Sequence, residues 1–478
     1  MLWTTLPDDR RSKKEKERMS INNTPTSEVK SIIEAQRLYF ASNATLDLKF
    51  RKEQLKKLQQ ALREWEKPLC EALWTDLHKS MEEAVMTELS IVSGEIKNHL
   101  SHLRGWMKSR SASTPLKMMP SRSYVVSEPL GNALIISPWN YPVQLLLNPL
   151  VGAISAGCTA ILKPSPYVPN VSRVLEEMIS ATFSKEYIAV VQGNREVNIA
   201  LLEERFDMIF FTGSPALGRK VMAAAAKNLT PVVLELGGKS PCIVDKDADI
   251  AIAARRIAWG KTLNAGQVCI APDYLLIHRS REKEFVEAFR KELEALHGRD
   301  IKASKHYVRM VNDEAFERVS GYIKEGTILL GGRTDAKERY IEPTLLKDVN
   351  PYSPVMQEEI FGPVLPMIPF NERSEALDFV RKREKPLALY YFGKVKDGKE
   401  FIRLTSAGGS CINDTIMHIA NENIPFGGVG NSGMGHYHGK PSFDAFSHQR
   451  SIVITPTWLD LPFRYMPYKT FCFVKRLL

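Results

Sequence analysis

Length, composition and charge narrow the class of protein. A chain of 478 residues is too long for one hydrophobic core, so two or three domains are expected. With 44% apolar and 25% charged residues, the composition is that of a globular protein and excludes a largely disordered chain. The net charge of +10 is accompanied by no nucleic-acid-binding motif, so nucleic acid is not an expected partner.

The cysteines and the termini indicate the cellular compartment in which the protein is expected. Six cysteines are scattered without a Cys-x-x-Cys pair or a Cys/His cluster, so we expect reduced thiols, no metal site and a cytoplasmic protein. No 18-residue apolar run occurs, and the basic N-terminus lacks the apolar core of a signal peptide. Residues 1–18 are either a flexible arm or precede the true start codon, and we set residues 1–27 apart as an N-terminal arm.

In chain order, the first strong pattern is helical and the next is that of buried strands. One face of the first predicted helix carries Leu55, Leu58, Leu62 and Trp65. Parallel strands are predicted at 133–137, 160–163, 188–192 and 208–211. Apolar residues at helical spacing between 171 and 179 separate the second strand from the third, which predicts a βαβ unit of a dinucleotide-binding domain.

A second α/β series is expected to follow the first. It begins with VVLEL at 232–236 and continues through PCIV, YLLIH and PVLPMI to ALYYF at 388–392. A helix around Phe285 to Leu296 is predicted to end at Gly298, a residue suited to a C-terminal cap. Two further strands, SRSYVVSEPL and RSIVITPTW, are predicted outside both sheets.

One turn in the first series has the features of an anion site. In FFTGSP, a strand ends at Gly213, Ser214 can cap the next helix and Pro215 fits its first position. Exposed amides at such a helix N-terminus bind phosphates, although the turn lacks the G-x-G-x-x-G spacing. Taken alone, the turn is more typical of an ordinary strand-to-helix connection.

Two residues are candidates for covalent chemistry. Cys269 follows the loop NAGQV, where it is either an exposed nucleophile or an inert buried thiol. Glu235 interrupts an apolar strand, where an unpaired carboxylate is costly to bury. It is therefore either a general base with a raised pKa or half of a salt bridge, for example with Lys239.

The motifs together resemble those of one enzyme superfamily. They are SPWNYP, LKPS, FFTGS, LELGGKSP, NAGQVC, EEIFGPVLP and PFGGVGNSGMG. In this order and spacing they resemble the aldehyde dehydrogenases, and the C-terminal stretch most resembles the class 3 or fatty aldehyde dehydrogenase branch. The likeness covers roughly residues 28–457. It implies NAD(P)-dependent oxidation of an aldehyde to a carboxylic acid.

The resemblance also assigns roles to residues. It implies that Cys269 is the nucleophile, that Glu235 activates the hydrolytic water, and that the Asn140 amide holds the oxyanion. The cofactor contacts that it implies are Lys163 at the adenosine ribose, Gly213 and Ser214 at the pyrophosphate, and Glu359 and Phe361 at the nicotinamide ribose. Each of these residues also has an ordinary structural interpretation when taken singly.

The implied architecture is a Rossmann-type cofactor domain, an α/β catalytic domain and a bridging β element. The expected boundaries are 28–107 with 131–234 for the cofactor domain, 235–439 for the catalytic domain, and 108–130 with 440–457 for the bridging element. That element is expected to pair across a homodimer. The C-terminal tail, residues 458–478, is aromatic and basic, and we favour dimer packing over peripheral contact with an anionic membrane.

The sequence only partly specifies the cofactor, the substrate and the type of reaction. Many relatives have an acidic residue directly after LKPS, whereas this chain has Pro166, so both NAD and NADP are expected. Apolar or aromatic candidates for the substrate entrance are Trp139, Tyr141, Ile416 and Met417, which favour a medium- or long-chain aliphatic or an aromatic aldehyde. The alternatives are a coenzyme A-acylating dehydrogenase, against which Glu235 argues, and a catalytically silent relative with a binding role.

Overall fold

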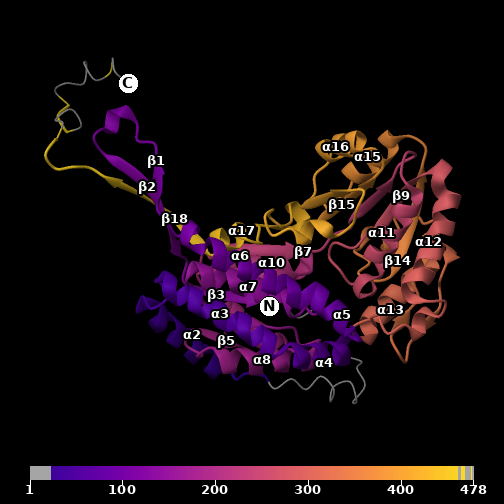
Figure 1. Ribbon diagram of the computed structural model, residues 1–478, viewed down its shortest axis with the longest axis horizontal. Coiled ribbons are helices and arrows are strands. Elements are labelled where there is room, and N and C mark those ends of the chain that lie inside the picture. Colours follow the sequence, from indigo (N-terminus) through magenta and orange to yellow (C-terminus); the bar gives the residue numbers. More distant parts are fainter. Residues whose placement is uncertain (1–22, 461–464, 469–474, 476–478) are drawn as a thin grey trace.

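Two α/β bodies and a projecting β arm make up the structure, a computed structural model that describes residues 23–460, 465–468 and 475 (Figure 1). Residues 1–22 and most of the aromatic and basic positions of the tail lie outside the described residues, and with them most of the expected N-terminal arm. Helix α2 (Thr26–Ala41) begins at the end of that expected arm. Within the described residues, no helix combines the length and apolar character needed to cross a membrane.

The first sheet has six strands in the order β17-β7-β6-β3-β4-β5, and all except β17 run parallel. Its strands are β3 (Asn132–Ile136), β4 (Thr159–Lys163), β5 (Ile188–Val190), β6 (Met208–Gly213), β7 (Val232–Leu236) and β17 (Gly433–Met434). Helix α8 (Pro169–Thr182) connects β4 to β5. The predicted βαβ unit and the four predicted strands are thereby confirmed.

The strand at 232–236 corrects the grouping made from the sequence. The apolar pattern assigns VVLEL to the second series, whereas β7 pairs in parallel with β6, from Ile209 opposite Val232 to Gly213 opposite Leu236. An apolar run carries no mark of which sheet it joins. The helix α10 (Pro215–Ala226) packs on both β6 and β7, which returns the chain to the strand position beside β6. Glu235 therefore lies near the carboxyl edge of the first sheet.

Helices cover both faces of the first sheet, as a largely parallel sheet requires. One face is packed by α2, α9 (Arg195–Glu203) and α10. The other is packed by α7 (Gln144–Ala156) and α8. A further layer outside α7 and α8 consists of α3 (Leu48–Glu64), α4 (Glu66–Leu77) and α6 (Ser90–Trp106). In α3, the predicted apolar face is buried at Leu55, Leu58 and Leu62.

The second sheet has seven strands in the order β10-β13-β14-β9-β8-β15-β16. They are β8 (Pro241–Val244), β9 (Tyr274–His278), β10 (Thr327–Leu330), β13 (Thr344–Lys347), β14 (Val364–Phe370), β15 (Ala388–Phe392) and β16 (Gly409–Ile412). One face packs against α11 (Ile250–Thr262) and α12 (Glu282–His297), and the other against α13 (Asp313–Tyr322), α15 (Arg373–Arg381) and α16 (Val395–Arg403). As predicted, Gly298 ends α12, with a positive φ of 79°.

The arm is a three-stranded antiparallel sheet in the order β1-β2-β18. Its strands are β1 (Arg110–Ala112), β2 (Arg122–Pro129) and β18 (Ser447–Ile454). The two segments predicted as strands outside both main sheets thus pair with each other. The arm projects away from the first body (Figure 1). The domain boundaries expected from the sequence remain predictions.

Candidate active site

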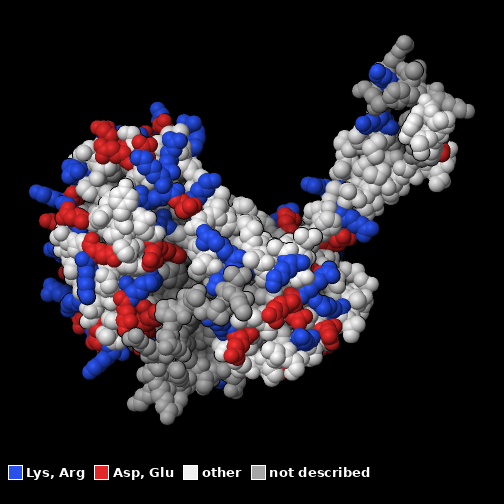
Figure 2. Space-filling view, turned by 180° about the vertical axis from the view of Figure 1, so that it is seen from behind, with Lys and Arg blue, Asp and Glu red and all other residues white. Residues whose placement is uncertain are grey.

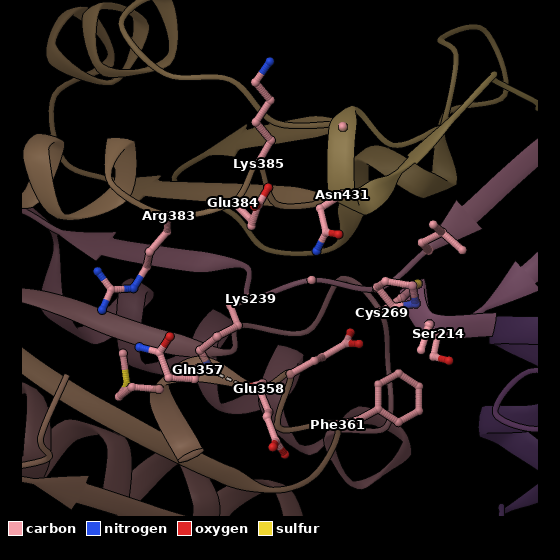
Figure 3. A pocket seen from close by; sticks show the side chains of 18 of the residues that line it. Ser214, Lys239, Cys269, Gln357, Glu358, Phe361, Arg383, Glu384, Lys385 and Asn431 are labelled. Atoms are coloured by element: carbon pink, nitrogen blue, oxygen red, sulfur yellow. Dashed lines mark hydrogen bonds between the residues drawn. The ribbon is translucent and has the colours of Figure 1, made fainter. Parts of the chain in front are cut away.

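A cleft of about 1690 Å³ lies between the two sheets and is lined by residues from both bodies (Figure 3). It is larger than the roughly 300–1,000 Å³ typical of a small-molecule site, so it has room for two ligands. The first body contributes the segments that follow β3, β6 and β7, which meet at the carboxyl edge of the sheet. Ligands of open parallel sheets bind at this edge.

The loop that delivers Cys269 has an unusual backbone. Asn264, Ala265 and Gly266 have positive φ values of 49°, 51° and 73° in succession. Two non-glycine residues in this region cost roughly 1–2 kcal/mol each, so the surrounding contacts must hold the loop. At Gly266 a side chain is excluded, because a Cβ atom would lie 2.4 Å from the Gly362 carbonyl oxygen. The loop is thus fixed against the segment that carries Phe361.

Cys269 lines the cleft and is half-buried. Burial raises the pKa of its thiol, and the nearby carboxylates of Glu359 and Glu235 raise that pKa further. In this arrangement the thiol holds its proton at neutral pH. The thiol of Cys269 and the carboxyl groups of Glu235 and Glu359 thus line the same cleft.

Glu235 lies on β7 with 3% of its surface exposed. Neither of its carboxylate oxygens has a hydrogen-bond partner among the residues that the structure describes. Burial raises the pKa of this carboxyl well above its usual value. The alternative of a salt bridge to Lys239 is wrong, because the Lys239 ammonium lies 2.8 Å from Asp273 Oδ1 instead.

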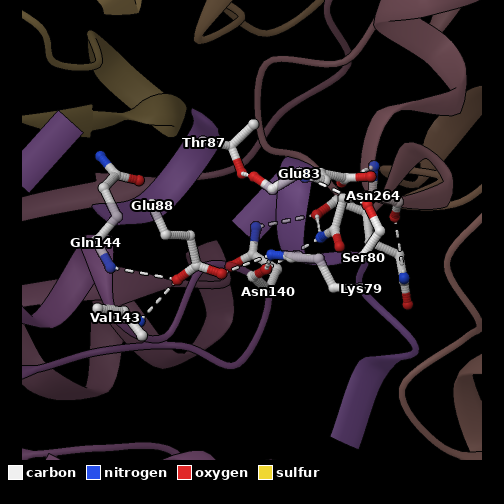
Figure 4. A network of polar contacts seen from close by, with 10 residues as sticks. Lys79, Ser80, Glu83, Thr87, Glu88, Asn140, Val143, Gln144 and Asn264 are labelled. Carbon is white, nitrogen blue, oxygen red and sulfur yellow. Dashed lines mark hydrogen bonds and ion pairs between the residues drawn. The ribbon is translucent and has the colours of Figure 1, made fainter. Parts of the chain in front are cut away.

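Asn140 is buried, and its side-chain Nδ2 donates to the Gln267 carbonyl oxygen at 3.0 Å. Its own backbone carbonyl oxygen accepts from Lys79 Nζ and from Asn264 Nδ2, both at 3.0 Å. The Lys79 ammonium also lies 2.6 Å from Glu88 Oε1 (Figure 4). Asn140 is therefore held from its backbone by a buried ion pair and from its side chain by the Cys269 loop.

Glu88 connects this ion pair to the start of helix α7. It lies in the π-helical turn Val85–Leu89, and its Oε2 accepts from the backbone N–H groups of Val143 and Gln144 at 2.8 and 3.3 Å. A carboxylate at a helix N-terminus is favoured by the helix dipole. The Asn140 segment, which leads into α7, is thereby fixed by charge as well as by packing.

The predicted anion site has the expected local geometry. Ser214 caps α10 by accepting from the Leu217 N–H, and Pro215 occupies the first turn of the helix. Gly213 and Ser214 both line the cleft. The N-terminus of α10 therefore lies at the cleft, which suits a pyrophosphate.

Lys163 is the predicted site residue that is set back from the cleft. It ends β4 beside Ile136 of β3, and its Nζ donates to the Pro164 carbonyl oxygen at 2.8 Å. Burial lowers the pKa of this ammonium to about 7. It shares the carboxyl edge of the sheet with Gly213 but is not among the residues that line the cleft in the described part of the chain.

Glu359 and Phe361 line the cleft from the second body. The Glu359 carboxylate packs against the backbone of Gly237, where a Cβ atom would lie 1.9 Å from its Oε2, and burial raises the pKa of this carboxyl to about 8. Phe361 has a positive φ of 49° and meets the Trp139 ring edge-on at 5.4 Å. A bulky residue with such a backbone marks a constrained position.

The substrate-entrance candidates are only partly brought together. Trp139 lines the cleft, whereas Tyr141 lies under the Lys79 ammonium, 4.2 Å from the ring centroid, and Ile416 is buried. Met417 is half-exposed. In the described residues, none of the last three contributes to the lining of the cleft.

The sequence reasoning missed the residues that brace the site. They are Lys79, Glu88, Asn264, Gln267, Asp273 and Arg318. Gln267 stands inside the NAGQVC motif, and a polar residue among small and apolar ones was a usable signal. Lys79 and Glu88 are too distant in sequence from the motifs for their contact with the Asn140 segment to be predicted.

A helix-covered parallel sheet with a cleft at its carboxyl edge and a helix N-terminus beside that cleft is the architecture of a dinucleotide-binding protein. The chain belongs to the aldehyde dehydrogenase family, whose sequence pattern it matches over residues 8–452. It is accordingly an NAD(P)-dependent enzyme that oxidises aldehydes. The function and the cofactor class predicted from the motifs are confirmed.

Known proteins resemble the chain over nearly its whole length. It is 47% identical to a 4,4'-diaponeurosporen-aldehyde dehydrogenase of Staphylococcus aureus, over 90% of this chain and 95% of that protein. It is 44% identical to a dimeric NADP-preferring aldehyde dehydrogenase of Canis lupus familiaris, over 92% and 98%. The solved structure of substrate-bound Staphylococcus aureus AldH superposes with a TM-score of 0.92 at 45% identity, covering 94% of this chain and 99% of that one.

Proposed function

We propose that this enzyme oxidises its aldehyde through a covalent intermediate on Cys269. The Cys269 thiol passes its proton to the Glu235 carboxylate as the sulfur bonds to the aldehyde carbon and the C=O π bond opens, and Glu235 releases this proton to solvent before hydrolysis. The resulting oxyanion accepts hydrogen bonds from the Asn140 amide and the Cys269 backbone N–H. Bound NAD(P)+ supplies the hydride acceptor. Loss of hydride leaves a thioester, which water hydrolyses to the carboxylic acid and the free thiol.

The observation that carries this proposal is the partnerless carboxylate of Glu235. A carboxyl group with a raised pKa beside the nucleophile is suited to take a proton from water. Such a base has no use if coenzyme A is the acyl acceptor, because a thiol then attacks the thioester. The geometry therefore favours hydrolysis over the acylating alternative.

The cofactor contacts follow from the edge of the first sheet. We place the pyrophosphate at Gly213 and Ser214, where the N-terminus of α10 lines the cleft. Lys163, at the same edge, is placed at the adenosine ribose. Glu359 and Phe361 are placed at the nicotinamide ribose, and the buried Glu359 Oε1, which has no partner among the described residues, supports a hydrogen bond to a ribose hydroxyl.

The substrate class follows from the apolar lining near Cys269. Trp139, Phe361 and Leu145 line the cleft, and the Trp139 and Phe361 rings contact each other. A relative in Staphylococcus aureus is named for 4,4'-diaponeurosporen-aldehyde. We propose a medium- or long-chain aliphatic or an aromatic aldehyde as the substrate.

A panel of aldehydes tests both the reaction and the substrate class. Aliphatic aldehydes of increasing chain length and a set of aromatic aldehydes are assayed by NAD(P)H absorbance, with and without coenzyme A. We expect turnover without coenzyme A and a rise in kcat/KM with chain length. A strict requirement for coenzyme A, or a preference for the shortest aldehydes, would contradict the proposal.

We further propose a homodimer in which the arm contacts the partner subunit. Within the described residues, β18 of the arm pairs only with β2, and β16 of the second sheet pairs only with β15. Each of these two strands therefore has one edge without a hydrogen-bonded neighbour strand. The arm also exposes apolar side chains, among them Leu116 and Met119, and few charged residues cover it (Figure 2). Trp458, at the start of the tail, is exposed as well. A relative in Canis lupus familiaris is named as dimeric. Light scattering of the intact chain and of a chain ending at Thr457 is expected to show a dimer that truncation weakens, whereas an intact chain that is monomeric would contradict it.

A further inference from the structure

Lys239 is a largely buried lysine that the proposed reaction does not use. It follows β7 and Glu235 along the chain, and only 11% of its side chain is exposed. Its ammonium donates to three oxygens, namely Asp273 Oδ1 at 2.8 Å, the Val355 carbonyl oxygen at 2.7 Å and the Glu358 carbonyl oxygen at 2.8 Å. All three N–H hydrogens of the ammonium are thereby used.

Asp273 extends this contact to the segment that follows Cys269. It stands four residues after the nucleophile, directly before β9, and its second oxygen accepts from the Ile360 N–H at 3.0 Å. Its backbone N–H donates to the Ser240 carbonyl oxygen at 2.8 Å. We call Lys239 and Asp273 together the Lys239–Asp273 clamp.

The clamp joins the three segments that carry the proposed catalytic and cofactor-binding residues. Lys239 belongs to the segment after Glu235, Asp273 to the segment after Cys269, and the atoms that they bind belong to the segment with Glu359 and Phe361. Figure 3 shows Lys239 and Glu358 side by side on the wall of the cleft.

A second side chain holds the same segment from its other side. The Arg318 guanidinium donates to the carbonyl oxygens of Glu359 and Ile360, both at 3.1 Å. Every residue from Glu358 to Ile360 is thus bonded through its backbone to a charged side chain. This matters because the next residue, Phe361, adopts a left-handed backbone that the surroundings must maintain.

We propose that Lys239, acting through the Lys239–Asp273 clamp, is a positioning residue that fixes the nicotinamide-ribose contacts relative to Cys269. The inference rests on the proposed roles of Glu359, Phe361 and Cys269. Without the clamp, the 358–361 segment keeps its hydrogen bonds to Arg318 but loses those that hold it relative to the segments after Glu235 and Cys269, so it can shift away from the nucleophile. Affinity for the cofactor then falls, and the bound nicotinamide is less often in line for hydride transfer.

The test is cofactor binding by Lys239→Met and Lys239→Arg. NADPH binding is measured directly by fluorescence titration, and Cys269 reactivity by the rate of iodoacetamide labelling. We expect Lys239→Met to raise the Kd for NADPH by roughly tenfold to a hundredfold and to lower kcat per titrated thiol. Lys239→Arg keeps the charge and several donors, so we expect its Kd to lie within roughly threefold of the parent value.

A matched control separates positioning from loss of an ion pair in general. Lys302 forms ion pairs with Asp335 and Glu338 at 2.7 and 2.9 Å in the second body and does not line the cleft. We expect Lys302→Met to leave the Kd for NADPH unchanged. A Lys239→Met protein that is folded, as judged by its Tm, and binds NADPH as tightly as the parent would overturn the proposal.

The remaining outcomes are decided by Asp273→Asn and by the double variant. If Lys239→Met does not fold, Asp273→Asn carries the test, because the amide keeps an oxygen for the Ile360 N–H while its hold on the ammonium weakens. We expect this change to raise the Kd roughly fivefold, and its effect to be non-additive with that of Lys239→Met. An unchanged Kd would refute the clamp.

Binding is measured without turnover, so failure of the clamp is distinct from failure of the proposed reaction, which the loss of activity in Cys269→Ala tests.

Discussion

Two buried carboxylates in this enzyme have opposite surroundings. Glu88 is fully buried, and its oxygens accept from the Lys79 ammonium and from the N–H groups of Val143 and Gln144. Glu235 is buried almost as deeply, yet neither oxygen has a partner in the described part of the chain. A buried charge without partners is costly, so the first stabilises the scaffold and the second is retained for chemistry.

Buried polar groups near the two carboxylates include atoms with and without hydrogen-bond partners. Around Glu88, the side chains of Lys79 and Gln267 bond to backbone groups on both sides. Around Glu235, the buried oxygens Thr212 Oγ1, Asn140 Oδ1 and Glu359 Oε1 lack partners among the described residues. Unsatisfied buried polar atoms are rare in folded proteins, so these three oxygens, which belong to residues that line the cleft, are candidates for contact with ligands or water.

The largest expected effect is that of removing the nucleophile. Cys269→Ala should lower aldehyde-dependent NAD(P)H formation by on the order of ten-thousandfold or more, because no covalent intermediate can form. Cys411→Ala is the matched control. This second half-buried thiol lies 3.4 Å from His418 Nδ1 and does not line the cleft, so its loss should leave turnover nearly unchanged. Comparable losses in both variants would show that the cleft does not define the site.

Measurements of stability should distinguish the structural role of Glu88 from the chemical role of Glu235. Lys79→Met leaves Glu88 buried without its ion-pair partner, so the free energy of unfolding should fall by about 3–5 kcal/mol. Turnover of the folded protein should also fall, by roughly tenfold to a hundredfold, because Asn140 loses a brace. Glu235→Gln removes an unpaired carboxylate and should leave the protein equally stable or more stable. Urea unfolding measures the stability of the Lys79→Met and Glu235→Gln variants. A large loss of stability in Glu235→Gln would contradict the proposed difference between Glu88 and Glu235.

The cofactor prediction concerns the position after LKPS. Pro166 stands there without a carboxylate to repel a 2′-phosphate, so we expect NAD and NADP both to support turnover. Pro166→Glu should lower kcat/KM for NADP relative to NAD by roughly tenfold, or about 1.4 kcal/mol. A preference of the parent enzyme for NAD above roughly a thousandfold, or about 4 kcal/mol, would mean that another group excludes the phosphate.

A separate prediction concerns the pH dependence of stability. Burial raises the pKa of Glu359 from 4.5 to about 8 in the folded protein. Its contribution is therefore full below the unfolded pKa of 4.5 and is lost as the pH rises through about 8, because the unfolded chain ionises first. Relative to Glu359→Gln, the parent should lose stability between pH 5 and pH 8. Parallel stability curves for the two proteins would show that this carboxyl is not desolvated as described.

Features that depend on a local sequence pattern could be predicted from the sequence. Features that depend on contacts between residues far apart in the sequence could not. The parallel strands β3, β4 and β6, the cap at Ser214 and the loop before Cys269 are all visible in short motifs. The sheet to which β7 belongs was not, because an apolar strand does not encode its neighbour. The partners of Lys239 and Asn140 come from segments tens to more than a hundred residues away, and only the fold brings them together.

The measurement that tests the central claim most directly is the pre-steady-state kinetics of Glu235→Gln. If the partnerless carboxylate activates the hydrolytic water, this variant should release a burst of NAD(P)H close to one equivalent per Cys269, followed by slow turnover. Intact-mass analysis should then find the acyl group on the enzyme. Steady-state turnover equal to that of the parent enzyme, with no accumulated thioester, would contradict the role of Glu235.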